Sequence, residues 1–312
     1  MQVEEELASF SPDRDTMLTI GVFDGVHLGH RRLIAELIRQ ARQKNLLAGV
    51  VTFRQHPEDL LSAGKRLPFL TDMKTRTKLL KEEGVDFIVT LSFNKELAGL
   101  SARHFMTLLQ QHLRMQGLVI GSDFALGKSR EGDTDAIQRL GKDMELSVTV
   151  VPPLKINGEV VSSTILRKAL AAGNIDKVHE LTGRPYSLHG KVVEGAGRGE
   201  GLGFPTANMD VKSGQALPPD GVYVGLTRAN GKIYQSMTNI GRNPTFGDTE
   251  RSVESYLVDY HGDLYGKEVY LDIVARLRDE KKFASAEELK KQISQDIVQG
   301  KTILESIGVK QP

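Results

Sequence analysis

The chain has 312 residues, which allows about two domains of ordinary size, and 39% hydrophobic with 26% charged residues is typical of globular proteins. Its 41 Lys and Arg residues against 40 Asp and Glu give a net charge of +1, so no basic excess indicates nucleic acid or a membrane surface as a partner. It has no cysteine, which excludes disulfides, Cys-bound zinc, iron–sulfur clusters and thiol nucleophiles.

The N-terminal segment MQVEEELASF is acidic and lacks the apolar stretch of a signal peptide. No apolar run in the sequence reaches the roughly 20 residues that a membrane helix needs. The lack of cysteine suits a reducing compartment. We therefore expect a cytoplasmic enzyme or binding protein.

The first half of the chain alternates short apolar runs with helical patterns. The runs typical of buried strands cover residues 17–23, 46–53, 85–91, 117–124 and 146–151. Apolar residues recur at helical spacing in residues 33–41, 71–83, 101–113 and 135–144. This order predicts an α/β domain with a parallel sheet and helices on both faces. In such sheets ligands bind at the carboxyl ends of the strands.

The pattern changes near residue 181, where a glycine-rich segment without helical period begins. Two alternating runs follow, joined by Asn230-Gly231, a strong hairpin signal because both residues tolerate positive φ. We expect a small antiparallel β-barrel, closed by a C-terminal helix that begins with the capping pair Ser285 and Glu288. The predicted domains are 1–181 and 182–312, with a boundary at about 181–186.

His27 and His30 stand at a strand-to-helix junction in the stretch GVFDGVHLGH, residues 21–30. A helix N-terminus offers free N–H groups and the positive end of the helix dipole, which suits phosphate, and histidines can donate hydrogen bonds to phosphate oxygens. Gly29 leaves room for a nucleotide to lie against the helix. Two alternatives stay open: a metal site, for which a third protein ligand is missing from the motif, and histidines that merely fill a helix start.

A second strand–helix junction carries Ser162, Ser163 and Thr164, followed by Arg167 one turn later. Their hydroxyls can cap the helix or bind phosphate, and the arginine can clamp phosphate oxygens with two hydrogen bonds. Helix capping alone explains the serines. The segment supports phosphate binding only when it is taken together with the first strand–helix junction, as a second phosphate site.

The stretch GVFDGVHLGH resembles the H-x-G-H element of nucleotidyltransferases that attack the α-phosphate of ATP. As a whole it is more similar still to the adenylyltransferase half of bacterial bifunctional riboflavin kinase/FAD synthetases, whose fold is Rossmann-like. Three later segments resemble that family in the same order: TFRQHPEDLL (52–61), GSDFALGKSREGD (121–133) and VSSTILRKAL (161–170). The sequence departs from the family pattern at Gln55, Ala125, Leu126 and Leu166.

In the second half, GLGFPTAN (201–208) combines glycines that give phosphates access to backbone N–H groups with Thr206 and Asn208. These two side chains point the same way if the segment is extended, and their oxygens are hard ligands suited to Mg²⁺. The alternative for this composition is a glycine-rich surface loop with an Asn turn.

GLGFPTAN resembles the P-T-A-N signature of riboflavin kinases. NIGRNPTFGD (239–248), VESYLVDYHGDLYGKEV (253–269) and RLRDEKKF (276–283) are similar to further elements of the same family. The resemblance aligns Glu254 with the catalytic glutamate of that family and places Arg278 near the flavin. The alternative for Glu254 is an exposed strand carboxylate paired with a nearby arginine, for example Arg251.

The resemblance covers residues 17–300 and implies two reactions. The C-terminal half would phosphorylate riboflavin to FMN with ATP, with Glu254 as the base and Mg²⁺ held with Thr206 and Asn208. The N-terminal half would adenylate FMN to FAD and release pyrophosphate, with His27 and His30 stabilising the charged transition state.

The resemblance also implies the remaining site residues and ligands. It assigns nucleotide binding to Gly21, Phe23, Gly29, Ser163, Thr164, Arg167, Gly201 and Gly203. It assigns flavin binding to His56, Asp123 and Arg278. The expected partners are small molecules: ATP, Mg²⁺, riboflavin, FMN and FAD. We expect no nucleic acid or membrane partner, and either a monomer or a homo-oligomer.

Two rival interpretations stay open. In the first, the chain is a riboflavin kinase only, and the departures at Ala125 and Leu126 mark a degenerate adenylyltransferase half. In the second, the chain is a non-enzymatic flavin-binding regulator, although the presence of His27, His30 and Glu254 argues against it.

Overall fold

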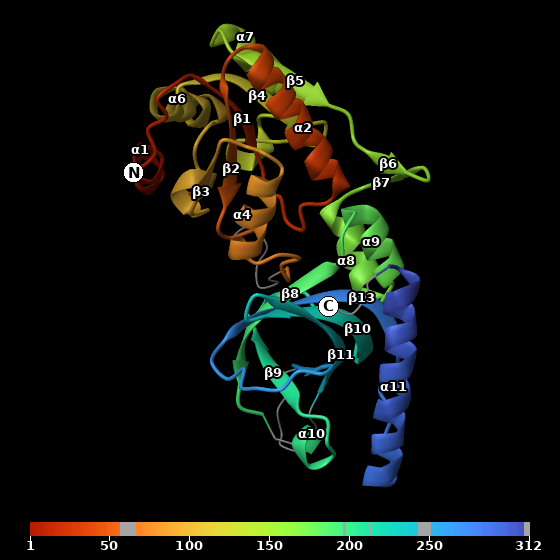
Figure 1. The fold of residues 1–312 in the computed structure, drawn as a ribbon. Helices are drawn as coiled ribbons and strands as arrows, with labels where there is room; N and C mark the ends of the chain where they lie inside the picture. Colours follow the sequence, from red (N-terminus) through yellow and green to blue (C-terminus); the bar gives the residue numbers. More distant parts are fainter. Residues whose placement is uncertain (57–66, 196–197, 213, 243–250, 309–312) are drawn as a thin grey trace. The chain divides into compact units, whose positions relative to one another are not determined.

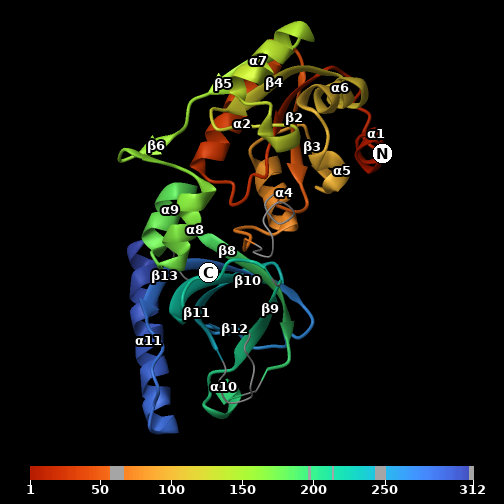
Figure 2. The ribbon, with the colours of Figure 1, turned by 180° about the vertical axis from the view of Figure 1, so that it is seen from behind.

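The computed structural model describes residues 1–56, 67–195, 198–212, 214–242 and 251–308. The chain divides into two compact units (Figures 1 and 2). Unit 1 contains Met1–Pro68 and Met73–Ser163, and unit 2 contains Phe69–Asp72 and Thr164–Pro312. The second unit therefore includes four residues from a point far upstream in the sequence.

Unit 1 is an α/β domain. Its strands are β1 (Thr16–Ile20), β2 (Leu47–Phe53), β3 (Phe87–Leu91), β4 (Met115–Gly121) and β5 (Ser147–Val151), followed by the short pair β6 (Lys155–Ile156) and β7 (Glu159–Val160). Its helices are α1 (Gln2–Ala8), α2 (Leu28–Gln43), α4 (Met73–Glu82), α5 (Lys95–Ala98), α6 (Ala102–Leu113) and α7 (Thr134–Asp143), with the 3₁₀ turn η1 (Lys128–Arg130). The five main strands pair in parallel in the order β3-β2-β1-β4-β5. The predicted parallel sheet is confirmed.

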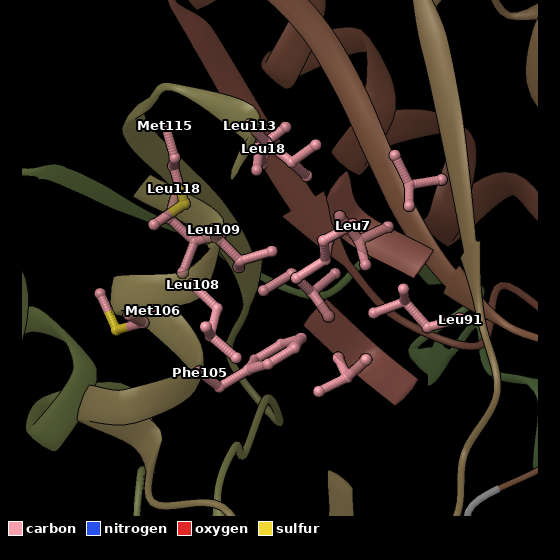
Figure 3. Packing of buried hydrophobic residues seen from close by; sticks show 14 of the residues in the cluster. Leu7, Leu18, Leu91, Phe105, Met106, Leu108, Leu109, Leu113, Met115 and Leu118 are labelled. Atoms are coloured by element: carbon pink, nitrogen blue, oxygen red, sulfur yellow. The ribbon is translucent and has the colours of Figure 1, made fainter. Parts of the chain in front are cut away.

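Alternating residues of the buried strand β1 pack into two separate hydrophobic clusters, because successive side chains of a strand point to opposite faces. Leu18 and Ile20 join α1 and α6 in one cluster, while Met17 joins α2 and α4 in the other. Figure 3 shows the first cluster, with Leu7 of α1, Leu18 of β1 and Leu109 of α6 among its labelled side chains. Both faces of the sheet are thus covered, as the near-continuous apolar strands predict.

Unit 2 is a closed antiparallel β-barrel with flanking helices. Its strands are β8 (Tyr186–Val193), β9 (Thr206–Val211), β10 (Gly221–Ala229), β11 (Lys232–Arg242), β12 (Arg251–Leu257) and β13 (Glu268–Arg278). Its helices are α8 (Ser163–Ala171), whose first residue belongs to unit 1, α9 (Ile175–Thr182), α10 (Arg198–Gly201) and α11 (Ala286–Ser306). The barrel order is β10-β11-β12-β9-β8-β13, which confirms the predicted β-barrel with a terminal helix.

Two local predictions in unit 2 are confirmed. Asn230 and Gly231 both have positive φ at the turn that joins β10 to β11. The Ser285 side chain accepts a hydrogen bond from the Glu288 backbone N–H and begins α11, although the Glu288 carboxylate accepts from the N–H of Ala284 and not from that of Ser285, as a capping box requires. Helix α11 then runs along the barrel wall in both ribbon views, where Leu304 packs with Val224 and other barrel residues (Figures 1 and 2).

The segment Phe69–Asp72 is built into unit 2 by backbone pairing. Phe69 exchanges hydrogen bonds with the carbonyl of Gly214 and the N–H of Ala216, both at 2.6 Å. Asp72 is buried, and its carboxylate lies 3.0 Å from Nδ1 of the buried His189 on β8. These contacts account for the assignment of four upstream residues to the barrel unit.

Candidate active sites

The first candidate site lies at the carboxyl ends of the central strands of unit 1. The strand order reverses at β1, whose neighbours are β2 and β4, and such a switch point is where open parallel sheets bind ligands. His27 and His30 follow β1, His56 follows β2, and Asp123 follows β4. The sheet thus directs four of the predicted residues to one edge.

His27 and His30 form a stacked pair at the start of α2. Their ring centroids are 3.6 Å apart, and the planes differ by 15°. His27 is the N-cap, and its Nδ1 accepts a hydrogen bond of 3.2 Å from the His30 N–H. Because Nδ1 is an acceptor, the proton of neutral His27 sits on Nε2, which is then a donor. His27 is buried and His30 is half-buried.

The predicted nucleotide residues of unit 1 surround this pair. Phe23 is buried with positive φ and contacts the His30 ring edge-on, with centroids 5.2 Å apart. A Cβ at Gly29 would lie 3.1 Å from the His27 ring, and a Cβ at Gly21 would lie 3.1 Å from the Phe23 ring. Ser163 donates a 2.9 Å hydrogen bond to the carbonyl of Asp24. The structure therefore brings these four predicted residues together with the histidines, and larger residues at the two glycines would crowd the rings.

The remaining predicted residues of the N-terminal half belong to other segments of the chain. Thr164 and Arg167 lie on α8 beyond Ser163, in the part of that helix that belongs to unit 2. Asp123 is exposed in the turn after β4, where its carbonyl accepts a hydrogen bond from Arg130. Residues 57–61 of the segment TFRQHPEDLL lie outside the described residues.

The second candidate site is a pocket of about 340 Å³ in unit 2. Apolar and aromatic side chains form much of its wall: Leu202, Phe204, Val222, Met237, Tyr256, Phe283, Leu289 and Ile293. Burial, assisted by the negative charge of Asp259, raises the pKa of the Tyr256 phenol, so this ring stays neutral. The polar lining includes Thr206, Asn239, Glu254 and Arg278. Apolar walls with a few convergent polar groups are typical of a site for a small organic molecule.

Three adjacent strands place the polar residues of this pocket in one row. Glu254 of β12 lies opposite Asn208 of β9 on one side and opposite Asn239 of β11 on the other. Thr206 lies opposite Tyr256 in the same ladder, so the two predicted metal ligands share a strand face with Glu254. Ser252 donates a 3.2 Å hydrogen bond to Oε1 of Glu254, while Arg251 pairs with Asp220. Arg251, the example of an arginine that could pair with Glu254, thus has a different carboxylate as its partner.

The residues predicted to hold Mg²⁺ fit a cation that the substrate phosphates also bind. Thr206 and Asn208 supply neutral oxygen ligands, and a Cβ at Gly195 would collide with the carboxamide of Asn208, so that glycine makes room for it. Among the described residues, no group of three or more His, Cys, Asp or Glu could hold a metal ion. Gly203 has positive φ before β9, which favours glycine at this position. Gly201 is exposed, and a Cβ there would contact nothing within 4 Å.

Arg278 is fixed to helix α11 at the pocket wall. Its guanidinium donates to both carboxylate oxygens of Asp296, with an Nη2–Oδ2 distance of 2.7 Å. Asp296 is 3% exposed and also accepts a hydrogen bond from Gln292. The guanidinium also lies 5.9 Å from the ring centroid of Phe283. Arg278 thus lines the pocket, and the Asp296 carboxylate balances its charge.

Family models match both halves of the chain. The model described as FAD synthetase matches residues 9–165, and the model described as riboflavin kinase matches residues 182–304. A bifunctional riboflavin kinase/FMN adenylyltransferase of Escherichia coli K12 is 36% identical over 306 residues, which cover 97% of this chain and 96% of that protein.

The chain belongs to the bifunctional riboflavin kinase/FMN adenylyltransferase family.

Other members of the family extend this similarity and confirm the family predicted from sequence. The Listeria monocytogenes protein of the same name is 34% identical, covering 91% of each chain, and the Bacillus subtilis protein is 32% identical, covering 90% of each. A crystal structure of a Streptococcus pneumoniae protein named macrolide-efflux protein has a TM-score of 0.88 at 29% identity, covering 96% of this chain and 97% of that one. Over the described part of this chain, no helix is both long and apolar enough to cross a membrane.

Sequence reasoning missed three residues that shape these sites. Asn239 stands in the quoted segment NIGRNPTFGD, of which residues 243–248 lie outside the described residues, but it received no role. Asp296 and Arg76 stand in polar helices, where a charged residue ordinarily faces water. Arg76 stands three and four residues before Leu79 and Leu80, on the buried stripe of its helix, and this spacing was the available signal for it.

Proposed function

We propose that this chain phosphorylates riboflavin to FMN in its C-terminal half and adenylates FMN to FAD in its N-terminal half, with ATP as the donor in both steps. The proposal assigns residues 1–181 to the adenylyltransferase domain and 182–312 to the kinase domain. Its main support is that both family models match in this order over nearly the whole chain.

In the kinase reaction, the Glu254 carboxylate accepts the proton of the riboflavin 5′-hydroxyl. That oxygen then attacks the γ-phosphorus of ATP, and ADP leaves. The cross-strand position of Glu254 beside Asn208 and Asn239 supports this role, because a rigid ladder holds the base at the polar row of the pocket. The apolar walls around Phe204 and Tyr256 accept the flavin ring.

Thr206 and Asn208 would hold Mg²⁺ in this site. When bound, the ion would neutralise phosphate charge. The two residues stand on one face of β9, and Thr206 is part of the pocket lining.

In the adenylyl transfer, a phosphate oxygen of FMN attacks the α-phosphorus of ATP, and pyrophosphate leaves. Negative charge builds up on the phosphate oxygens, and the N–H donors of His27 and His30 at the start of α2 stabilise it. Ser163 holds the loop before these histidines through the Asp24 carbonyl. His56 and Asp123 would contact FMN, Gly21, Phe23 and Gly29 would line the nucleotide site, and Thr164 and Arg167 would bind its phosphates. Gly201 and Gly203 belong to the corresponding ATP loop of the kinase half.

One assay tests both reactions. The purified chain is incubated with riboflavin, ATP and Mg²⁺, and riboflavin, FMN and FAD are separated over time. We expect FMN to rise and then to give way to FAD. FMN that accumulates without FAD would support a kinase with a degenerate N-terminal half, and stoichiometric binding without turnover would support the flavin-binding regulator.

A single variant separates the two halves. His30→Ala should stop the formation of FAD from FMN and leave the phosphorylation of riboflavin intact, because the histidine lies in unit 1 and the kinase pocket in unit 2. Loss of both activities in a folded His30→Ala protein would refute the assignment of two separate sites. A cytoplasmic location, and a monomer or homo-oligomer that needs neither nucleic acid nor membrane, stay predictions.

A further inference from the structure

Unit 1 contains a fully buried arginine that none of the reaction steps above uses. Arg76 lies on α4, and its side chain is 1% exposed. Burying a charged group is costly unless hydrogen bonds and an opposite charge compensate for it. The contacts of Arg76 therefore show which groups compensate for its burial and which segments it connects.

The guanidinium joins the two chain segments that lead into the adenylyltransferase site. Nη1 donates to the carbonyl of Val22, at 3.0 Å, and to the carbonyl of Phe53, at 3.2 Å. Val22 belongs to the loop between β1 and α2, and Phe53 ends β2. The hydroxyl of Thr52 also donates to the Val22 carbonyl, at 3.1 Å. Arg76 thus ties the His27 loop to the strand end that precedes His56.

The same guanidinium balances the charge of Asp24 inside the loop. Nη2 lies 3.6 Å from Oδ1 of Asp24, whose side chain is also 1% exposed. The Asp24 carbonyl accepts the hydrogen bond from Ser163. Asp24 is therefore held through its side chain by α4 and through its backbone by the residue that begins α8.

This loop needs support because its backbone is strained. Phe23 and Val26 have φ of +53° and +36°, values that residues with a Cβ rarely adopt because they strain the backbone. Phe23 and His27 are the residues whose rings contact His30. A relaxed loop would move the His27 and His30 rings away from their stacked arrangement.

We propose that Arg76 is a positioning residue of the adenylyl transfer: by binding Val22, Phe53 and Asp24 at once, it keeps the strained loop in the shape that presents His27 and His30 to the nucleotide phosphates. The inference rests on the proposed FMN adenylyltransferase activity. Arg76 touches neither histidine in the contacts above, so its effect is on the geometry of the transition state and not on the chemistry of a reacting atom.

The test compares three variants in steady-state assays of both reactions. Arg76→Lys keeps the charge but not the planar fork that reaches two carbonyls and a carboxylate. Arg76→Met leaves Asp24 buried without its counter-charge, and Arg76→Met combined with Asp24→Asn removes both charges, which is often neutral for stability. The matched control is Arg103→Met combined with Asp143→Asn, which removes an exposed ion pair of the same unit.

We expect kcat for FAD formation from FMN to fall about tenfold in Arg76→Lys and about 100-fold in the double variant, with KM for FMN within about threefold of wild type. Riboflavin phosphorylation should be unchanged in both, and the control pair should change neither reaction. Thermal unfolding of each variant, followed by circular dichroism, reports stability separately.

Two results would overturn the inference. The first is a wild-type kcat for FAD formation in a folded Arg76→Lys protein. The second is a double variant that regains both stability and kcat, because Arg76 would then only balance charge. A wild-type protein that makes no FAD from FMN would instead refute the proposed function, so the two failures are distinguishable.

Discussion

Asn208 and Glu254 lie directly opposite each other on the adjacent antiparallel strands β9 and β12. Side chains of such cross-strand neighbours start only about 5 Å apart on one face of the sheet. A proposed metal ligand and the proposed base of the kinase reaction are therefore held in a fixed relation by backbone hydrogen bonds. Either residue can therefore be substituted while the strand pairing keeps the other in position.

Glu254→Gln should lower kcat for riboflavin phosphorylation by about 10²–10⁴-fold, because glutamine keeps the shape of the side chain but cannot accept the hydroxyl proton. FMN supplied directly should still be converted to FAD at the wild-type rate. Both rates can be measured by chromatography of the flavins. A Glu254→Gln protein that phosphorylates riboflavin normally would show that another group is the base.

Asn208→Ala should raise the Mg²⁺ concentration that gives half-maximal kinase activity by roughly tenfold, because one neutral oxygen ligand is removed. Calorimetric titration of Mg²⁺ into the chain with bound ADP should show the same weakening without turnover. The Mg²⁺ requirement of FAD formation from FMN should stay as in wild type. An unchanged Mg²⁺ titration would move the ligand role away from Asn208.

Asp296→Ala should lower the free energy of unfolding by about 3–5 kcal/mol, because it leaves the guanidinium of Arg278, whose side chain is 15% exposed, without its counter-charge. It should also raise KM for riboflavin, since Arg278 lines the pocket. Denaturant unfolding and kinase kinetics check the two effects. Asp143→Ala is the matched control, because both side chains of the Arg103–Asp143 pair are exposed and the pair contributes at most about 1 kcal/mol.

Glu6 should make the stability of the protein depend on pH in the acidic range. Burial alone raises the pKa of Glu6, but hydrogen bonds from the N–H and hydroxyl of Ser92, together with a hydrogen bond from Gln2 and the charge of Arg54, bring the pKa below the ordinary value of 4.5. A lowered pKa in the folded state stabilises the protein above pH 4.5, and this contribution is lost as pH falls through the folded pKa.

Unfolding of the Ser92→Ala variant at several pH values checks the role of Glu6. We expect the variant to be less stable than wild type near pH 7 and the difference to shrink below pH 4.5. A stability difference that does not change with pH would mean that Ser92 contributes by packing alone.

The sequence predicted the arrangement of elements well because their patterns are local. The apolar run of residues 46–53 became β2, Leu47–Phe53, and the helical pattern of 101–113 became α6, Ala102–Leu113. The strand predicted at 17–23 ends at Ile20, because Phe23 adopts positive φ and the chain turns before α2.

Features that depend on distant parts of the chain could not be read from the sequence. Arg76 looks like a surface residue of a polar helix until β1 and β2 supply the carbonyls that it binds. Asp296 lies 18 residues from Arg278, and only the docking of α11 on the barrel joins them. Asn239 gained its place beside Glu254 from the strand register, which no local pattern specifies.

The inclusion of Phe69–Asp72 in unit 2 has a consequence for producing the two domains as separate proteins. A cut directly before residue 182, where the second matched segment begins, gives a C-terminal fragment without these four residues, without α8 and with only the last residue of α9. His189 would lose its buried aspartate, and the backbone of Gly214 and Ala216 would lose its hydrogen bonds with Phe69. The two family models match consecutive segments of the chain, but the second folded unit also contains residues from within the first segment. A separate kinase domain would therefore need Phe69–Asp72 added to the truncated chain.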